Sequence, residues 1–277
     1  MSQTVAVITP AFKAQATILA TVRSVLAQTH ADWQLWIVAD DDLDYAALLS
    51  QAGIVDQRIV HIGSGGIGRG ASCARNVALE RIDAPYAAIL DADDRLKPQK
   101  LELAVAALAE HAIVTTALDV MDEGFGHLRF VGQGSDRLLA PGQHKWVSLS
   151  MDSMLVWDRR RADGRYDTTM SNMTDLEFLL QLYAGVPASY HLGTPLHDYV
   201  KRSASMSNGA NVADGMIASK TTILQRLRAG SYKLPAADVA GLERFLEISL
   251  AAEALYAAAL AERPGLLFED HLEPRLA

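Results

Sequence analysis

The sequence has a single cysteine, fewer basic than acidic residues, and no long uncharged apolar run. Cys73 can form neither an intramolecular disulfide nor a cluster of thiolate ligands for zinc, which is typical of proteins from a reducing compartment. Lys and Arg number 25 against 33 Asp and Glu, which gives a net charge of −8. Such a charge does not suit a protein whose main partner is nucleic acid.

No apolar stretch is long enough to span a bilayer, and the first residues lack the basic start and apolar core of a signal peptide. We therefore expect a cytoplasmic protein without a transmembrane segment, and we leave open its peripheral association with the inner face of a membrane. The oligomeric state is left open as well. With 277 residues and 50% hydrophobic side chains, the chain can form one large α/β domain with a modest appendage.

Short apolar segments alternate with segments of helical periodicity in the first part of the chain. In the first helical segment, Ile18, Val22 and Val25 fall on one face and can pack on a sheet. This alternation predicts an α/β fold with a mostly parallel, Rossmann-like sheet between layers of helices. The expected strands lie at 5–9, 34–40, 58–62, 86–90 and 112–118, and the expected helices at 18–29, at 72–82 and from 98 onward.

The alternation ends near residue 122, and the following segment is rich in glycine. We expect irregular structure there, followed by a helix over 175–183 and two strand-like segments at 188–191 and 196–201. Beyond residue 211 the pattern predicts only helices.

Acidic residues follow two of the predicted strands. Asp91 and Asp93 come directly after the strand at 86–90, and side chains at positions i and i+2 of an extended segment point the same way. Asp40 ends an earlier strand, and the carboxyl ends of parallel strands meet at one edge of a sheet. Carboxylate oxygens suit Mg²⁺ or Mn²⁺ bound to a diphosphate. The alternative is an acidic turn that simply faces water.

Five ordered blocks resemble the pattern of glycosyltransferase family 2, at 7–12, 24–29, 34–40, 74–79 and 90–94. The resemblance implies a GT-A fold and an inverting enzyme that moves a sugar from a nucleotide-diphosphate sugar, a UDP-sugar above all, to an acceptor hydroxyl. The acceptor would be a carbohydrate or glycoconjugate in polysaccharide or glycoconjugate biosynthesis. A GT-A domain would then cover 1–210, with its nucleotide-sugar-binding half at 1–118 and its acceptor half at 119–210. Residues 211–277 would form a helical extension.

The resemblance also implies roles for single residues. Thr9 and Asp40 would hold the nucleotide base, and Arg75 would help at the base or the ribose. Asp91 would contact the ribose or sugar, and Asp93 would be the ligand of the divalent cation, Mn²⁺ or Mg²⁺. The other positions that match donor-binding sites are Pro10, Phe12 and Arg202.

Two later segments extend the resemblance. Asp175 lies in a segment, 173–179, that is similar to the family's Glu-Asp helix start, whose aspartate is the general base for the acceptor hydroxyl. A carboxylate can accept that proton, and partial burial would raise its pKa toward the working range. The alternative is an acid that only stabilises the first turn of a helix. Arg202 lies in a segment, 199–207, that resembles the family's Tyr-Arg and Ser-x-Ser stretch, which meets the donor phosphates.

The chain departs from the family pattern at several positions, so the donor base is left open. Phe12 and Lys13 stand where the family has Tyr-Asn, and Ala39 replaces the first acid of its Asp-Asp pair. Thr174 replaces a Glu, and Gln181 replaces an Arg.

The glycine run at 63–68 supports a different hypothesis, because it fits the dinucleotide fingerprint of a nicotinamide-dependent oxidoreductase. That fingerprint needs its helix to begin at the middle glycine, whereas a cap at Ser72 would delay the helix. We interpret the run as a mobile loop beside the donor. A third hypothesis is a catalytically idle sugar-nucleotide-binding protein.

For some side chains the sequence predicts only whether they face the interior or the solvent. We expect Asp40 to point inward and Asp41 and Asp42 to point mostly outward, because clustered carboxylates repel one another. In the glycine-rich segment we expect a packed Trp146 and a surface His144, although either could contact a ligand.

Overall fold

The structure, a computed structural model, describes residues 2–202 and 212–276. Within these ranges one mixed sheet runs in the order β3-β2-β1-β4-β9-β6-β10-β5, with β7 paired to β6 and β8 paired to β10. The first four strands along the chain are mutually parallel, as are β6 and β10, so the predicted mostly parallel α/β fold is confirmed. The strands are β1 (Val5–Ala11), β2 (Trp33–Ala39), β3 (Ile59–Gly63), β4 (Tyr86–Ile89), β5 (Arg95–Leu96), β6 (Ile113–Met121), β7 (His127–Val131), β8 (Arg137–Leu139), β9 (Val156–Asp158) and β10 (Ser189–Val200).

Helices cover both faces of the sheet because side chains alternate along each strand. On β1, Val7 packs with α1 and α4, whereas Ile8 packs with α3 and α6 on the other face. Ile18, Val22 and Val25 of α1 are buried against the sheet, as predicted. The helices are α1 (Ile18–Leu26), α2 (Tyr45–Gln51), α3 (Ala71–Leu79), α4 (Lys100–Leu108), α5 (Pro141–Val147), α6 (Thr174–Leu182), α7 (Val212–Arg228), α8 (Ala236–Glu262) and α9 (Phe268–Leu272), with a short 3₁₀ helix at Glu273–Arg275.

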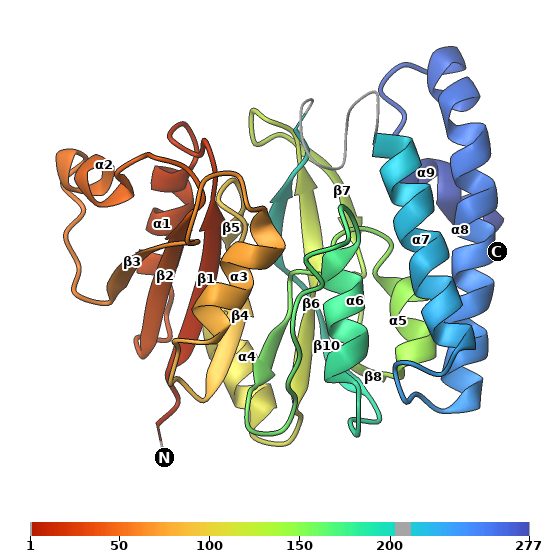
Figure 1. The fold of residues 1–277 in the computed structure, drawn as a ribbon, viewed down its shortest axis with the longest axis horizontal. Coiled ribbons are helices and arrows are strands. Elements are labelled where there is room, and N and C mark those ends of the chain that lie inside the picture. The colour runs from red at the N-terminus through yellow and green to blue at the C-terminus, as the bar shows by residue number, and fades with distance from the viewer. Residues whose placement is uncertain (1, 203–211, 277) are drawn as a thin grey trace.

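Helices α7, α8 and α9 lie at the end of the molecule opposite α2 (Figure 1). The described residues beyond 211 are predominantly helical, as predicted. Leu227 of α7 and Phe245 of α8 belong to the same hydrophobic cluster as Phe178 of α6 and Ala74 of α3. The extension therefore packs on the side of the sheet that carries α3 and α6. In the described part of the chain, no helix is both long and apolar enough to cross a bilayer.

Three expectations about local structure were wrong. The glycine-rich segment is not irregular throughout, because β6 and β7 form an antiparallel pair and β8 pairs with β10. The two expected strands at 188–201 are one strand, β10, whose register shifts on both sides of Pro195. Proline cannot donate to the ladder, which favours such an irregularity. Helix α3 begins at Ala71 with Gly70 as N-cap, so Ser72 lies inside the helix.

A buried ion pair joins two helices of the extension. The Lys220 Nζ of α7 lies 2.5 Å from the Glu253 Oε1 of α8, and the side chains are 2% and 5% exposed. Replacing Lys220 with Met leaves Glu253 buried without its partner, so we expect the free energy of unfolding to fall by about 3–5 kcal/mol. Chemical denaturation measures it. The double variant Lys220→Met/Glu253→Met should recover most of this loss, and a single variant as stable as the parent would contradict the assignment.

Candidate active site

Arg75 lies between two carboxylates that come from different elements. Its Nη2 is 2.6 Å from the Oδ1 of Asp91, which follows β4, and its Nη1 is 2.9 Å from the Oδ1 of Asp175, in the first turn of α6. The Arg75 side chain is only 4% exposed. Burial alone would lower the pKa of the guanidinium, but Asp175 and Asp91 raise it above its ordinary value, so the charge is held between the two acids.

Asp175 has the properties expected of a proton acceptor. Burial raises the pKa of its carboxyl to about 6, with Arg75 opposing the shift and Asp91 and Asp152 adding to it. The helix that carries it starts after Met173, whose φ of 54° places the backbone in the left-handed region. Such a conformation is strained in a residue other than glycine and is often found at functional sites.

Tyr166 completes this cluster, and no motif in the sequence identified it. Its ring lies 5.0 Å from the guanidinium carbon of Arg75 and stacks on Phe178 of α6 with ring centroids 4.3 Å apart. Burial, together with the nearby Asp175 carboxylate, raises the pKa of its phenol well above 10, and the hydroxyl has no hydrogen-bond partner among the described residues. Tyr166 belongs to a segment without regular structure, so neither periodicity nor spacing could have indicated it.

Asp91 and Asp93 lie close together, but the expected extended geometry was wrong, because the backbone turns here and the N–H of Asp94 donates to the carbonyl of Asp91 at 3.1 Å. Burial raises the pKa of Asp93 to about 6, and repulsion from Asp91 adds to the shift, whereas the Arg202 guanidinium lowers it. The next acid, Asp94, points inward, where its Oδ1 accepts a hydrogen bond of 2.8 Å from the backbone N–H of Val200. This turn therefore has two acids near its surface and one in the core.

The carboxylate pair fits a divalent cation that is shared with a ligand. Repulsion from Asp91 adds to the raised pKa of Asp93, which a cation between the two carboxylates would relieve, and hard oxygen donors are those that Mg²⁺ and Mn²⁺ prefer. Across residues 2–202 and 212–276, no group of three or more His, Cys, Asp or Glu side chains could hold a metal ion by itself. Asp91 and Asp93 would therefore provide part of the coordination, and diphosphate and water oxygens would provide the rest.

Asp40 is turned inward, as expected, but it organises the glycine loop. Its carboxylate accepts hydrogen bonds from the Ser64 hydroxyl at 2.5 Å and from the backbone N–H groups of Arg69 at 3.0 Å and Gly70 at 2.7 Å. No motif in the sequence indicates this contact. Because α3 begins only at Ala71, this glycine run does not match the dinucleotide fingerprint. Asp41 is half-buried and binds the Tyr45 hydroxyl, whereas Asp42 is exposed as expected.

The other donor-site candidates lie at the ends of β1 and β10. Thr9 is fully buried, and its Oγ1 has no hydrogen-bond partner among the described residues, whereas Phe12 is 48% exposed. Pro10 is aligned with Val38 of β2 near the edge that carries Asp40. Arg202 follows β10 and acts on Asp93 through its charge. The Ser-x-Ser stretch at 203–207 lies outside the described residues.

The two uncertain aromatic positions have structural partners. Trp146 packs on Phe245 of α8, with ring centroids 6.1 Å apart, as expected for a packed tryptophan. The prediction of a surface His144 was wrong, because the ring is buried and its Nε2 lies 2.8 Å from Asp152.

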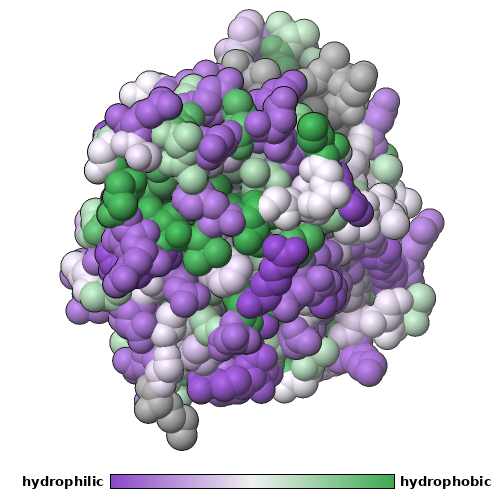
Figure 2. Space-filling model, turned by 60° about the vertical axis from the view of Figure 1, so that its left-hand side comes forward, coloured by the Kyte–Doolittle hydropathy of each residue, from purple (hydrophilic) through white to green (hydrophobic). Residues whose placement is uncertain are grey.

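A separate groove of about 220 Å³ lies at the ends of β2 and β3. Seen from this end, the molecule shows a hollow in which apolar side chains are ringed by hydrophilic ones (Figure 2). Ile37 and Tyr45, which line the groove, belong to the core on the α1 side of the sheet, whereas Arg75 comes from α3 on the other side. The groove is therefore not part of the carboxylate site.

Two solved structures share the fold. S. aureus TarS in complex with UDP-GlcNAc matches with a TM-score of 0.68 at 14% identity, over 99% of this chain and 82% of that one. The mannosyltransferase PcManGT from Pyrobaculum calidifontis, in complex with GDP-Man and Mn²⁺, matches with a TM-score of 0.59 at 15% identity, over 95% and 76% of the two chains. At these identities the likeness concerns the fold alone, and it agrees with the expected GT-A type.

Sequence comparison gives closer relatives over a shorter stretch. The putative teichuronic acid biosynthesis glycosyltransferase TuaG of Bacillus subtilis is 41% identical over 109 residues, which are 39% of this chain and 43% of that protein. The glucosyltransferase WfgD of Escherichia coli, which is named for transfer from UDP-Glc to a GlcNAc-diphosphoundecaprenol, is 35% identical over 109 residues, 39% and 42% of the two chains. The match thus spans less than half the length of either relative.

The model of the family described as "Glycosyl transferase family 2" matches residues 6–149, just over half of the chain. The chain therefore belongs to glycosyl transferase family 2.

Proposed function

We propose that this protein is an inverting, metal-dependent glycosyltransferase that moves a sugar from a nucleotide-diphosphate sugar to an acceptor hydroxyl. The observation that carries the proposal is the position of Arg75, which joins Asp91 at the mouth of the sheet to Asp175 at the start of α6. This pairing brings the residues that the family resemblance assigned to the donor and to the base into one cluster. The pKa of about 6 for Asp175 suits a base that works near neutral pH.

The reaction needs no covalent intermediate with the protein. The acceptor oxygen forms a bond to the anomeric carbon while the bond from that carbon to the diphosphate oxygen breaks on the opposite face, which inverts the configuration. Asp175 accepts the hydroxyl proton, and the nucleoside diphosphate leaves with the bonding electrons. Arg75 keeps Asp175 oriented and close to Asp91 throughout.

A divalent cation, Mn²⁺ or Mg²⁺, would be held by Asp93 with the help of Asp91. When bound, such an ion neutralises the charge that builds up on the leaving diphosphate. Arg202, whose charge already acts on Asp93, would contribute a second positive group on the same side. Thr9, Pro10, Phe12 and Asp40 would line the nucleoside site at the ends of β1 and β2.

The names of the relatives support a UDP-sugar as donor and a bacterial surface glycan or its lipid-linked precursor as acceptor. The division of the chain is also proposed. Residues 1–118 would bind the donor, 119–210 would face the acceptor, and 211–277 would form the helical extension. The extension shares a hydrophobic cluster with α6, which connects it to the base.

A thermal-shift panel tests the proposal. UDP-GlcNAc, UDP-Glc, GDP-Man and NADH are compared with Mn²⁺ and with excess chelator. One sugar nucleotide at about 100 times its Kd should stabilise the protein by roughly 2.7 kcal/mol, and the shift should disappear with the chelator. Stabilisation by NADH instead would support an oxidoreductase. Binding without release of nucleoside diphosphate in the presence of acceptor glycans would indicate an idle binding protein.

A further inference from the structure

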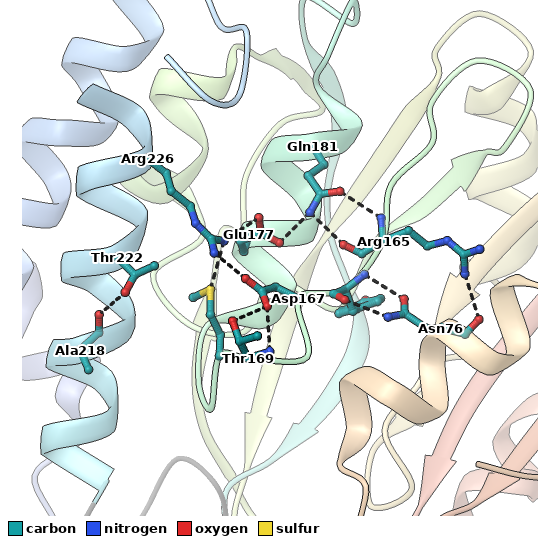
Figure 3. Close-up of polar contacts among 11 residues, drawn as sticks. Asn76, Arg165, Asp167, Thr169, Glu177, Gln181, Ala218, Thr222 and Arg226 are labelled. Atoms are coloured by element: carbon teal, nitrogen blue, oxygen red, sulfur yellow. Dashed lines mark hydrogen bonds and ion pairs between the residues drawn. The ribbon is translucent and has the colours of Figure 1, made fainter. Parts of the chain in front are cut away.

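The segment that carries Tyr166 has no regular structure, yet it is clamped on both sides by side-chain amides. Asn76, next to Arg75 on α3, binds the Tyr166 backbone in both directions, with its Oδ1 accepting from the N–H at 2.9 Å and its Nδ2 donating to the carbonyl at 2.8 Å. Gln181 of α6 does the same to Arg165, at 3.0 Å and 2.8 Å. These paired contacts hold the segment between the two helices (Figure 3).

Beyond Tyr166 the segment is held by a charge from the C-terminal extension. The Nη2 of Arg226, on α7, lies 2.5 Å from the Oδ2 of Asp167, and its Nη1 lies 3.1 Å from the Oε1 of Glu177. Figure 3 shows Arg226 reaching from α7 toward both acids, with Asn76 at the far side of the network. The other oxygen of Glu177 accepts from Gln181 at 2.7 Å, so the arginine connects directly with the amide clamp.

Arg226 compensates the negative charges of Asp167 and Glu177, which lie close to each other and at least partly inside the protein. Glu177 is 4% exposed, and its pKa is raised by burial, which Gln181 and Arg226 oppose. Asp167 adds a repulsive charge to Glu177. Without Arg226 these acids would face each other without a cation, and one or both would have to move or bind a proton. Asp167 follows Tyr166, and Glu177 is on the same helix as Asp175.

We propose that Arg226 is a positioning residue for catalysis, whose paired contacts with Asp167 and Glu177 fix both Tyr166 and Asp175 against Arg75. The inference rests on the proposed function. It also assigns a role to the helical extension, since α7 supplies the arginine. Helix α7 packs closely on the segment in a second place, where a Cβ on Gly215 would collide with the Asn172 side chain.

The test compares Arg226→Gln with Arg228→Gln, a matched control on the same helix. Arg228 is 54% exposed and pairs only with Glu243 and Glu247 of α8 among the ion pairs of the described residues. A displacement of about 1 Å in a catalytic group can cost about 10²-fold in rate. We expect Arg226→Gln to lower kcat at least tenfold with the KM for the donor within twofold, and Arg228→Gln to stay within twofold on both.

Two further variants separate positioning from a general loss of structure. Arg226→Gln combined with Glu177→Gln removes one of the two acids left without a cation and the repulsion between them, so part of the lost kcat should return. Arg226→Lys should retain more activity than Arg226→Gln. Equal kcat for Arg226→Gln and Arg228→Gln would overturn the proposal. The proposal would also be overturned if Arg226→Gln lost kcat and donor affinity in parallel and the added Glu177→Gln restored neither. If Arg226→Gln does not fold, the kcat of Arg226→Lys relative to Arg228→Gln decides instead.

Hydrogen exchange measured by mass spectrometry gives a readout that does not need turnover. Amides of residues 159–175 should exchange at least tenfold faster in Arg226→Gln than in Arg228→Gln. Unchanged exchange in that segment would contradict the role of Arg226 even if the enzyme were active. Faster exchange in a protein that transfers no sugar would instead count against the proposed function.

Discussion

We expect the replacement of Asp175 with Asn to lower kcat by about 10²- to 10⁴-fold, the contribution typical of a general base, and to leave the affinity for the donor nearly unchanged. Asparagine has almost the same shape but cannot accept the proton of the acceptor hydroxyl. Donor affinity should persist because Asp40, Asp91 and Asp93 remain in place. Nucleoside diphosphate release under steady-state conditions measures kcat, and thermal shift with the donor measures binding.

The pH profile provides the control for this variant. Burial raises the pKa of Asp175 to about 6, and a base works only when deprotonated, so kcat/KM of the parent should fall as the pH drops through 6. The raised pKa of Asp175 also makes the free energy of unfolding depend on pH. The folded pKa lies above the unfolded value of 3.8, so the folded state binds more protons, and this group's contribution to stability declines as the pH rises from 3.8 to 6. An Asp175→Asn variant that keeps the parent rate would exclude Asp175 as the base.

If the proposed metal site is correct, we expect the replacement of Asp93 with Ala to abolish the metal-supported part of the reaction. A bound cation stabilises the leaving diphosphate by several kcal/mol, so we expect a loss of about 10³-fold in kcat/KM at any Mn²⁺ concentration the assay tolerates. The stabilisation by Mn²⁺ with nucleoside diphosphate should also disappear from thermal melts. Titration of Mn²⁺ at fixed donor separates weaker metal binding from loss of the site.

Asp42→Ala is the matched control for Asp93→Ala, because it removes an exposed acid from the other acidic strand end. We expect that variant to keep the parent dependence on Mn²⁺. Should Asp93→Ala respond to Mn²⁺ as the parent does, the ion is held elsewhere. Asp91→Ala would then show whether Asp91 alone is the ligand.

Much of the first half of the fold could be predicted because its signals are local. The alternation of apolar strands with helical stripes depends on neighbours a few residues apart, and it located β1, β2, β3 and β4 to within a few residues. The proximity of Asp91 and Asp93 was expected for the wrong reason, because the chain turns at these residues instead of running extended, although Asp91 does raise the pKa of Asp93. The inward turn of Asp40 followed from repulsion among adjacent acids.

The contacts around Arg75 and Arg226 could not be predicted in the same way. Tyr166 reaches Arg75 from a segment without periodicity, and Asp167 meets an arginine that lies on α7, after the described chain has passed through α6 and β10. Pairing across such separations depends on which elements the core brings together, and no local pattern encodes it.

The sequence by itself determined the class of the fold, the edge of the sheet that carries the acids, and the resemblance to one family, because strand and helix periods and strand-end motifs are written in consecutive residues. The tertiary structure alone decided that Arg75 bridges two acids, that Asp40 holds the glycine loop, and that β9 enters the sheet antiparallel between β4 and β6. Such arrangements depend on burial and on charges that meet only after the chain has folded. The residues that raise the pKa of an acid or form an ion pair with it are far from it in the sequence.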